Sequence, residues 1–201
     1  MLLLACLTGM RVSEIAKAAV QDLKHFQRDD TIGTAIQWHL RVVGKGNKFR
    51  RIPLPTVLIG ALEEYLRKRG FSQSLASLVS MERRIPLIGH LPKKASLGAL
   101  PEPHMHLQTA SMGEAYKTVF ERAARALAVH DEDAGKALAK ASAHWLRHTH
   151  ATHSIRLGTS VAMTKDNLGH ASIDTTSIYT HTDLNERHEQ MEAFAEKFAA
   201  G

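Results

Sequence analysis

The chain has 201 residues, 44% of them hydrophobic, so it can form a folded core and is neither a disordered tail nor a disulfide-stabilised mini-protein. Its single cysteine, Cys6, excludes an internal disulfide and a zinc site built on paired cysteines, and a free thiol favours the reducing cytoplasm. The formal net charge of +6 favours a polyanionic partner. The apolar opening over residues 1–7 is too short for a membrane span and has no basic segment before it, as a signal peptide would.

Helices are predicted at the beginning of the chain. The apolar run over residues 2–8 predicts a buried helix that ends at Gly9. Because this run has no polar residues before it, we expect the chain to be the carboxy-terminal part of a longer protein. A second helix is predicted from Arg11 to about Leu23, since apolar residues recur there on one face.

A β-hairpin and a helix are predicted next. Apolar and polar residues alternate over 36–43, which indicates a half-buried strand. Residues 44–47 contain two glycines and an asparagine, which are typical of a turn, and 49–54 predicts the returning strand. Leucines at helical spacing predict a helix over 56–69 that ends at Gly70.

The second half of the chain is predicted to be mostly helical. Prolines and glycines interrupt residues 71–110, so an irregular connection is expected there. A helix is predicted over 111–128, opened by a capping box between Ser111 and Glu114, and at most one short helix follows over 129–141. Further helices are predicted over 143–156, from Ser160 to Gly169, from Ser172 to about Tyr179, and over 184–199. The expected fold class is therefore mainly α with a small antiparallel β-sheet (α+β).

One predicted helix carries a pair of side chains suited to phosphate. His144 and Arg147 are three residues apart, so they project from the same side of a helix. A guanidinium can hold two phosphate oxygens while an imidazole moves a proton. The alternative is a metal site, since His144 and His148 have the spacing at which two imidazoles can face one ion. We expect no metal, because the segment between them lacks an acid and a guanidinium beside a cation is repulsive.

Four further positions could contribute to an anion site. Arg11 lies near a predicted helix start, where backbone N–H groups attract anions. Lys45 stands between two glycines at a hairpin turn, where the backbone can approach a ligand closely. His170 follows Gly169 at a helix end, and Tyr179 comes nine residues later. Each of these residues alone has an ordinary structural explanation, and only their order and spacing together are specific.

Together, these motifs resemble the tyrosine recombinases, the phage integrase family. Residues 8–15 (TGMRVSEI) resemble the first arginine motif of that family, and residues 43–48 (VGKGNK) its lysine hairpin. Residues 144–149 (HWLRHT) resemble its H-x-x-R motif, and residues 168–170 (LGH), followed by Tyr179, resemble its last motif with the nucleophile. The resemblance implies the catalytic-domain fold of the tyrosine recombinases.

The resemblance also implies a reaction. Members of the family break and rejoin DNA strands without metal, ATP or another cofactor. Tyr179 would attack the scissile phosphate and form a 3′-phosphotyrosine intermediate, which splits a difficult step into two. His144 would act as the base, and Lys45 would protonate the leaving 5′-oxygen. The implied activity is that of a site-specific recombinase or integrase.

The remaining motif residues would stabilise charge. Arg11, Arg147 and His170 would hold the nonbridging oxygens, whose charge grows in the transition state, and such preorganised donors usually give the largest share of the rate. Glu14, one helical turn after Arg11, matches an acidic position that steadies the active site in the family and would not touch the substrate.

The resemblance divides the chain in two. Residues 1–183 would be the catalytic domain, with its lead-in helix truncated and a divergent connection over about 71–142, and the family's amino-terminal DNA-binding domain would lie outside this chain. The helix in 184–201 is a possible docking segment for a neighbouring subunit. Its apolar stripe consists of Leu184, Met191, Phe194 and Phe198. Deleting it is expected to leave the fold intact. The implied partners are double-stranded DNA and other protomers, as a tetramer on DNA, with no membrane and a cytoplasmic location.

Three alternatives remain open at this point. A type IB topoisomerase-like enzyme would use the same nucleophile but reseal the same strand, and the order of the motifs argues against it. A DNA-binding remnant without catalysis would not need all six positions: Arg11, Lys45, His144, Arg147, His170 and Tyr179. A metal-dependent hydrolase would use the histidines and be inhibited by EDTA.

Overall fold

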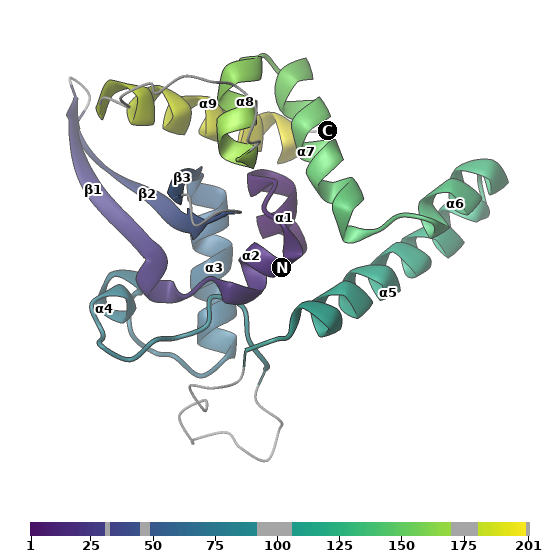
Figure 1. The fold of residues 1–201 in the computed structure, drawn as a ribbon, viewed down its shortest axis with the longest axis horizontal. Helices are drawn as coiled ribbons and strands as arrows, with labels where there is room; N and C mark the ends of the chain where they lie inside the picture. The colour runs from purple at the N-terminus through teal and green to yellow at the C-terminus, as the bar shows by residue number, and fades with distance from the viewer. Residues whose placement is uncertain (31–32, 45–48, 92–105, 170–180, 200–201) are drawn as a thin grey trace.

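Helix α1 (Leu2–Thr8) lies at the centre of the molecule, in contact with helices from both ends of the chain and with the sheet (Figure 1). A computed structural model describes residues 1–30, 33–44, 49–91, 106–169 and 181–199. The described elements are mostly helices, and they pack around one small antiparallel sheet. The predicted α+β class is therefore confirmed. None of the helices in these ranges is long and apolar enough to cross a membrane.

Three antiparallel strands form one sheet within the described residues. They are β1 (Leu23–Asp30), β2 (Gly33–Val43) and β3 (Phe49–Leu54), arranged in that order. Leu40 in the middle strand lies opposite Leu23 of β1 and Ile52 of β3, and all three side chains are buried. The predicted antiparallel pairing of β2 with β3 is therefore confirmed, while the turn predicted between them falls mostly on residues 45–48, outside the described residues.

The helix predicted from Arg11 to about Leu23 is wrong in its second half. Helix α2 spans only Val12–Lys17, and a short 3-10 turn, η1 (Val20–Asp22), leads into β1. The reason is a tertiary contact. The carbonyl of Ala18 accepts a hydrogen bond from the Leu87 amide (2.9 Å), and the Val20 amide donates to the Ile85 carbonyl (2.8 Å). Backbone pairing with a segment far along the chain thus overrides the local helical pattern.

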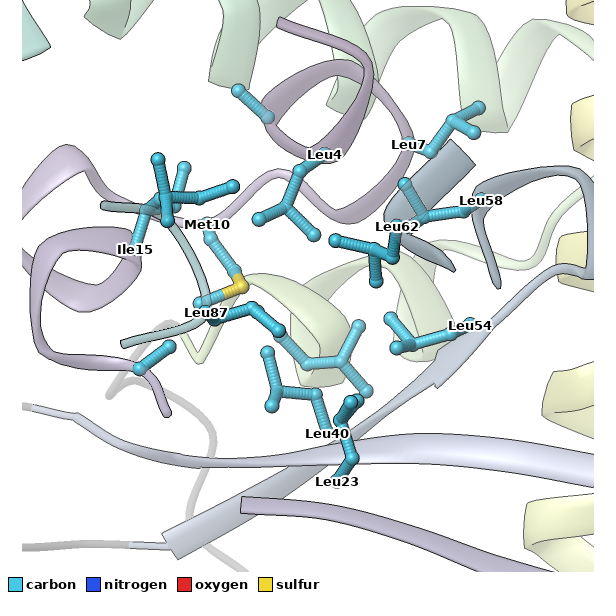
Figure 2. Close-up of a cluster of buried hydrophobic side chains, with 14 of the residues drawn as sticks. Leu4, Leu7, Met10, Ile15, Leu23, Leu40, Leu54, Leu58, Leu62 and Leu87 are labelled. Atoms are coloured by element: carbon cyan, nitrogen blue, oxygen red, sulfur yellow. The ribbon is translucent and has the colours of Figure 1, made fainter. Parts of the chain in front are cut away.

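The hydrophobic core is built on α1, the sheet and helix α3 (Thr56–Lys68). Figure 2 shows leucines from these elements meeting Met10, Ile15 and Leu87. On α3 the fully packed side chains recur every four residues, as predicted for its inner face: Leu58, Leu62 and Leu66. This core fixes the end of α1 and the start of α2, where the first arginine motif lies.

The irregular segment after α3 is anchored by polar contacts. Its described part contains one short helix, α4 (Leu75–Val79), which was not predicted from the sequence. The Tyr65 hydroxyl donates to the Gly89 carbonyl (2.6 Å), and the buried guanidinium of Arg69 donates to the Pro86 carbonyl (2.6 Å). Residues 92–105 lie outside the described residues.

Helices α5 (Thr109–Ala128) and α6 (Glu132–Ala139) form a hairpin that projects from the rest of the molecule (Figure 1). The pair packs closely, because a Cβ added at Gly135 would lie 2.6 Å from the Cβ of Ala128. The predicted capping box at Ser111 is wrong. The Met112 amide already bonds the Gln108 carbonyl (3.0 Å), so the helix begins earlier and Ser111 lies inside its first turn.

Three more helices follow among the described residues: α7 (Ala143–Arg156), α8 (Val161–Leu168) and α9 (His181–Ala199). The predicted bounds of α7 are confirmed, and the Ser160 hydroxyl caps α8 as predicted by accepting from the Met163 amide (3.2 Å). The helix predicted from Ser172 to about Tyr179 lies outside the described residues.

Helix α9 packs on its own chain in this structure. Met191 and Phe194 are buried in the core beside β3 and α1. The carboxylate of Glu192 accepts hydrogen bonds from the backbone amide (2.6 Å) and the hydroxyl (2.9 Å) of Thr56 at the start of α3. The predicted exchange of this helix with a neighbouring subunit stays a prediction.

Candidate active site

The first arginine motif packs closely against α7 and α8 at Gly9. Gly9 ends α1 with φ of 61°, a left-handed conformation that favours glycine. A Cβ at this position would lie 2.6 Å from ring carbon Cδ2 of His150 and 2.6 Å from Cδ2 of Leu168. Only a residue without a side chain permits both the turn and this close approach.

Arg147 ties the ends of two helices together from the inner face of α7. Its guanidinium is buried and donates through Nη1 to the Gly9 carbonyl (2.7 Å) and through Nη2 to the Leu168 carbonyl. Burial, followed by the positive charge of Arg11, lowers the pKa of Arg147 to about 10, while Glu14 acts in the opposite direction. Arg147 therefore keeps its charge at neutral pH.

Arg11 and Glu14 form a second layer of the same cluster. Arg11 immediately precedes α2, and its backbone amide donates to Oε2 of Glu14 (2.8 Å), which caps the helix. Its guanidinium donates through Nη1 to Oε1 of Glu14 (3.1 Å). The Arg11 side chain is 39% exposed and that of Glu14 is 6% exposed. Glu14 thus supports Arg11 from the interior of the protein, and its expected role in steadying an active site stays a prediction.

Arg50 was not among the site residues predicted from the sequence. This β3 residue donates through Nη1 and Nη2 to both Glu14 oxygens (2.9 and 2.7 Å), and through Nε to the Asn167 carbonyl on α8 (2.9 Å). Its sequence signal was available: Arg50 shares a strand face with buried Ile52 and Leu54, where an arginine needs an ionic partner.

The arginines lower the pKa of Glu14. Burial of the carboxyl opposes ionisation, but hydrogen bonds from Arg50 and from the Arg11 amide, with both positive charges, outweigh it and leave the pKa below its ordinary value. Glu14 is therefore ionised at neutral pH. The cluster contains three guanidinium groups, those of Arg11, Arg50 and Arg147, and one carboxylate. Its net charge is therefore positive, which suits an anion.

Asn167 connects this cluster to the last helix. Its side-chain oxygen accepts a hydrogen bond from Nη2 of Arg187 on α9, and the same nitrogen donates to the Arg51 carbonyl on β3 (2.9 Å). Arg187 and Asn167 were also missed, and since their partners are distant in sequence, no local pattern indicated them. The end of α8 is thus held from two sides.

His144 lies on the outer face of α7, one turn from Arg147. Its side chain is exposed, and its ring meets that of His148 edge-on, with 4.5 Å between centroids. The outer face continues as an open pocket lined by Trp145, His148, Thr149, Thr152 and His153. Among the residues that the structure describes, no three His, Cys, Asp or Glu side chains gather as metal ligands would.

The structure therefore brings Arg11, Glu14 and Arg147 together, with His144 on the same helix as Arg147. The other predicted site residues, Lys45, His170 and Tyr179, lie outside the described residues. The described residues next to two of them can still be located. Gly44 directly follows β2, and a Cβ added at Gly169 would lie 3.0 Å from the Arg50 side chain.

Comparisons with known proteins identify the family. The sequence model of the phage integrase family matches residues 1–186. The chain belongs to this family. It is 30% identical over 178 residues to tyrosine recombinase XerC of Pelobacter propionicus, an alignment that covers 89% of this chain and 45% of the relative. The chain thus spans about half the length of the curated relatives that it matches.

Solved structures of integrases and recombinases share the fold. The integrase of mycobacterium phage Brujita superposes with a TM-score of 0.55 at 22% identity, over 96% of this chain and 50% of that one. The XerH site-specific recombinase, bound to palindromic difH substrate in a post-cleavage complex, gives 0.51 at 18% identity, over 94% of this chain and 40% of that one. The predicted catalytic-domain fold of this phage integrase family member is therefore confirmed.

Proposed function

We propose that the chain is the catalytic part of a site-specific DNA recombinase that breaks and rejoins DNA strands through a 3′-phosphotyrosine intermediate. The observation that carries this proposal is the cluster of Arg11, Arg50 and Arg147 around Glu14, a preformed cationic site at the meeting point of three family motifs. The match to tyrosine recombinase XerC supports the chemistry, and the difH complex of XerH supports DNA as the partner.

In the proposed reaction, the hydroxyl of Tyr179 attacks the phosphorus and the bond to the 5′-oxygen breaks. Arg11 and Arg147, with His170, stabilise the charge on the nonbridging oxygens. His144 accepts the tyrosine proton, and Lys45 donates a proton to the leaving 5′-oxygen. Because one phosphodiester is exchanged for another, the reaction needs no ATP, and we expect no metal or other cofactor.

Capture of the covalent intermediate tests this proposal. The chain is incubated with short nicked duplexes of random sequence, from which the cleaved end diffuses away, and the protein–DNA adduct is detected on a denaturing gel. We expect an adduct that resists EDTA, and we expect Tyr179→Phe to abolish it while DNA binding is retained, since phosphate contacts dominate affinity. An adduct in the Tyr179→Phe variant would contradict the proposed nucleophile.

Tyr116→Phe is a matched control for this experiment. Tyr116 is fully buried on α5, where its hydroxyl donates to the Met1 carbonyl (3.2 Å). The substitution should cost about 1 kcal/mol of stability, as one lost hydrogen bond does, and leave the adduct unchanged.

Joined products between two duplexes would distinguish a recombinase from an enzyme that only reseals the same strand.

The proposal extends to assembly in the cytoplasm as a tetramer on DNA, in which α9 passes to a neighbouring subunit. Exchange would have to release the contacts of Glu192 with Thr56 and of Phe194 with the core, and a neighbour would have to replace them. A disulfide introduced between α9 and its own β3 should then block joined products but leave the first cleavage intact. Unchanged recombination by the crosslinked protein would contradict exchange.

A further inference from the structure

Arg50 directs its hydrogen bonds at the protein rather than at solvent. Both Nη atoms bond the carboxylate of Glu14, Nε bonds the carbonyl of Asn167, and the side chain is only 11% exposed. Arg11 differs, because a single guanidinium nitrogen contacts Glu14 and its side chain is 39% exposed. Of the two arginines that share one carboxylate, Arg50 is therefore largely buried and Arg11 is partly exposed to solvent.

The two arginines compete for the same carboxylate. A buried carboxylate is costly unless a charged partner compensates it, and the planar fork of an arginine matches its two oxygens best. In this structure Arg50 supplies that fork. Without it, Arg11 is the guanidinium that remains in hydrogen-bond contact with Glu14 among the described residues, and its own fork would turn inward.

Arg50 also contacts the end of α8. A Cβ at Gly169 would lie 3.0 Å from both Cδ and Nη1 of Arg50, and the bond to the Asn167 carbonyl holds the last turn of that helix. These partners lie 117 and 36 residues away in the chain, counted to Asn167 and to Glu14. One side chain therefore connects the strand hairpin, the first arginine motif and the helix that precedes His170.

We propose that Arg50 is a positioning residue: by compensating Glu14 it leaves the guanidinium of Arg11 available to a phosphate, while it holds the end of α8 in place. That this phosphate is a DNA phosphodiester rests on the proposed function. The assignment of Arg50 to Glu14 and of Arg11 to the phosphate does not depend on it. Arg50 itself touches no reacting atom in this scheme.

Binding of inorganic phosphate tests the proposal independently of catalysis. The probe is the NMR signal of the Nε–H group of Arg11, assigned by its loss in Arg11→Lys, followed as phosphate is added to the full chain. We expect Arg50→Gln to weaken phosphate binding about tenfold, the effect of one lost charged contact. We expect Glu14→Gln combined with Arg50→Gln to return the affinity to within about twofold of the wild type, because an amide no longer captures Arg11.

Two controls separate positioning from charge and from folding. Arg51→Gln removes the same charge from an exposed neighbour on β3 and should change phosphate affinity less than about twofold. Arg50→Lys keeps the charge without the fork and should fall between the wild type and Arg50→Gln; it replaces that variant if the latter fails to fold. The proposal is overturned if the Arg50 variant binds phosphate like the wild type, or if the double variant stays as weak as the single one.

The adduct assay, run in parallel, separates this proposal from the proposed function. Phosphate binding that follows the expected pattern, without any adduct in the wild type, would support the positioning role and count against the recombinase. An adduct in the wild type, together with phosphate binding that is indifferent to Arg50, would support the recombinase and overturn the positioning role.

Discussion

The two faces of helix α7 differ in how firmly they hold their side chains. On the inner face, Arg147 and His150 are buried, and each ring or guanidinium bonds a backbone carbonyl. On the outer face, His144, Trp145 and His148 are exposed. The contrast indicates that the fold itself positions the guanidinium of Arg147, the group proposed to stabilise charge. The proposed proton transfer by His144 then depends on a side chain that is free to adjust to the substrate.

The largest effect is expected from Arg147→Gln on the inner face. The substitution removes the charged hydrogen bonds to the carbonyls of Gly9 and Leu168, and a buried polar group that loses such a partner costs its full desolvation. We expect a loss of about 4 kcal/mol in the free energy of unfolding, measured in urea. Trp145→Ala, on the outer face next to it, should cost less than about 0.5 kcal/mol. Equal losses in the two variants would remove the distinction between the faces.

Phe194→Ala should have the next largest effect. Phe194 of α9 is buried and meets His150 on the inner face edge-on, with 5.4 Å between ring centroids. Truncation of such a side chain should cost about 3 kcal/mol, and half-buried Phe198→Ala should cost clearly less. This burial also opposes the prediction from sequence that deletion of 184–201 leaves the fold intact. A loss below about 1 kcal/mol for Phe194→Ala would restore that prediction.

Acidification should destabilise the fold through its buried histidines. Burial lowers the pKa of His150 to about 4, although its hydrogen bond with the Cys6 carbonyl (2.9 Å) acts to raise it. Burial, followed by the positive charge of Arg51, lowers the pKa of His39 to about 4. Unfolded histidines take up protons near pH ~6.5, whereas these two stay neutral until about pH 4. Stability is therefore complete above that unfolded value and is lost as the pH falls towards 4.

The expected loss is on the order of 2 kcal/mol for each buried histidine over this pH range. Unfolding in urea at several pH values measures it. His39→Gln should reduce the slope by about one proton, and the same substitution at exposed His90 controls for the loss of an imidazole. An unchanged slope in the His39 variant would show that this ring is not the source.

The smallest effects on stability are expected at the outer face. His144→Gln and His148→Gln should each change the free energy of unfolding by less than about 0.5 kcal/mol, because both side chains are exposed. Their effects on adduct formation should differ. Loss of a general base typically costs about a hundredfold or more, so His144→Gln should slow the adduct strongly and His148→Gln only slightly. The reverse order would assign the base to His148.

Local patterns in the sequence were sufficient for several elements. The alternation over 36–43 predicted β2, and the spacing of leucines predicted α3, because each pattern reports which side of its own element is buried. The same reasoning placed Glu14 one turn after Arg11. It also predicted that His144 and Arg147 project from the same side of their helix, whereas in the structure Arg147 is buried on the inner face of α7 and His144 is exposed on the outer face. Such spacings are set by the geometry of a single element and need no knowledge of the rest of the fold.

The sequence by itself therefore determined the fold class and the family, since these depend on short-range periodicity and on the order of motifs along the chain, while the roles of the motif residues stay predictions. Only the tertiary structure decided that α2 stops at Lys17, that Arg50 compensates Glu14, and that α9 packs on its own core. Each of these outcomes depends on a partner that lies tens of residues away. A buried charge or an unpaired backbone group takes whichever partner the folded chain places beside it, and spacing within one segment does not encode that choice.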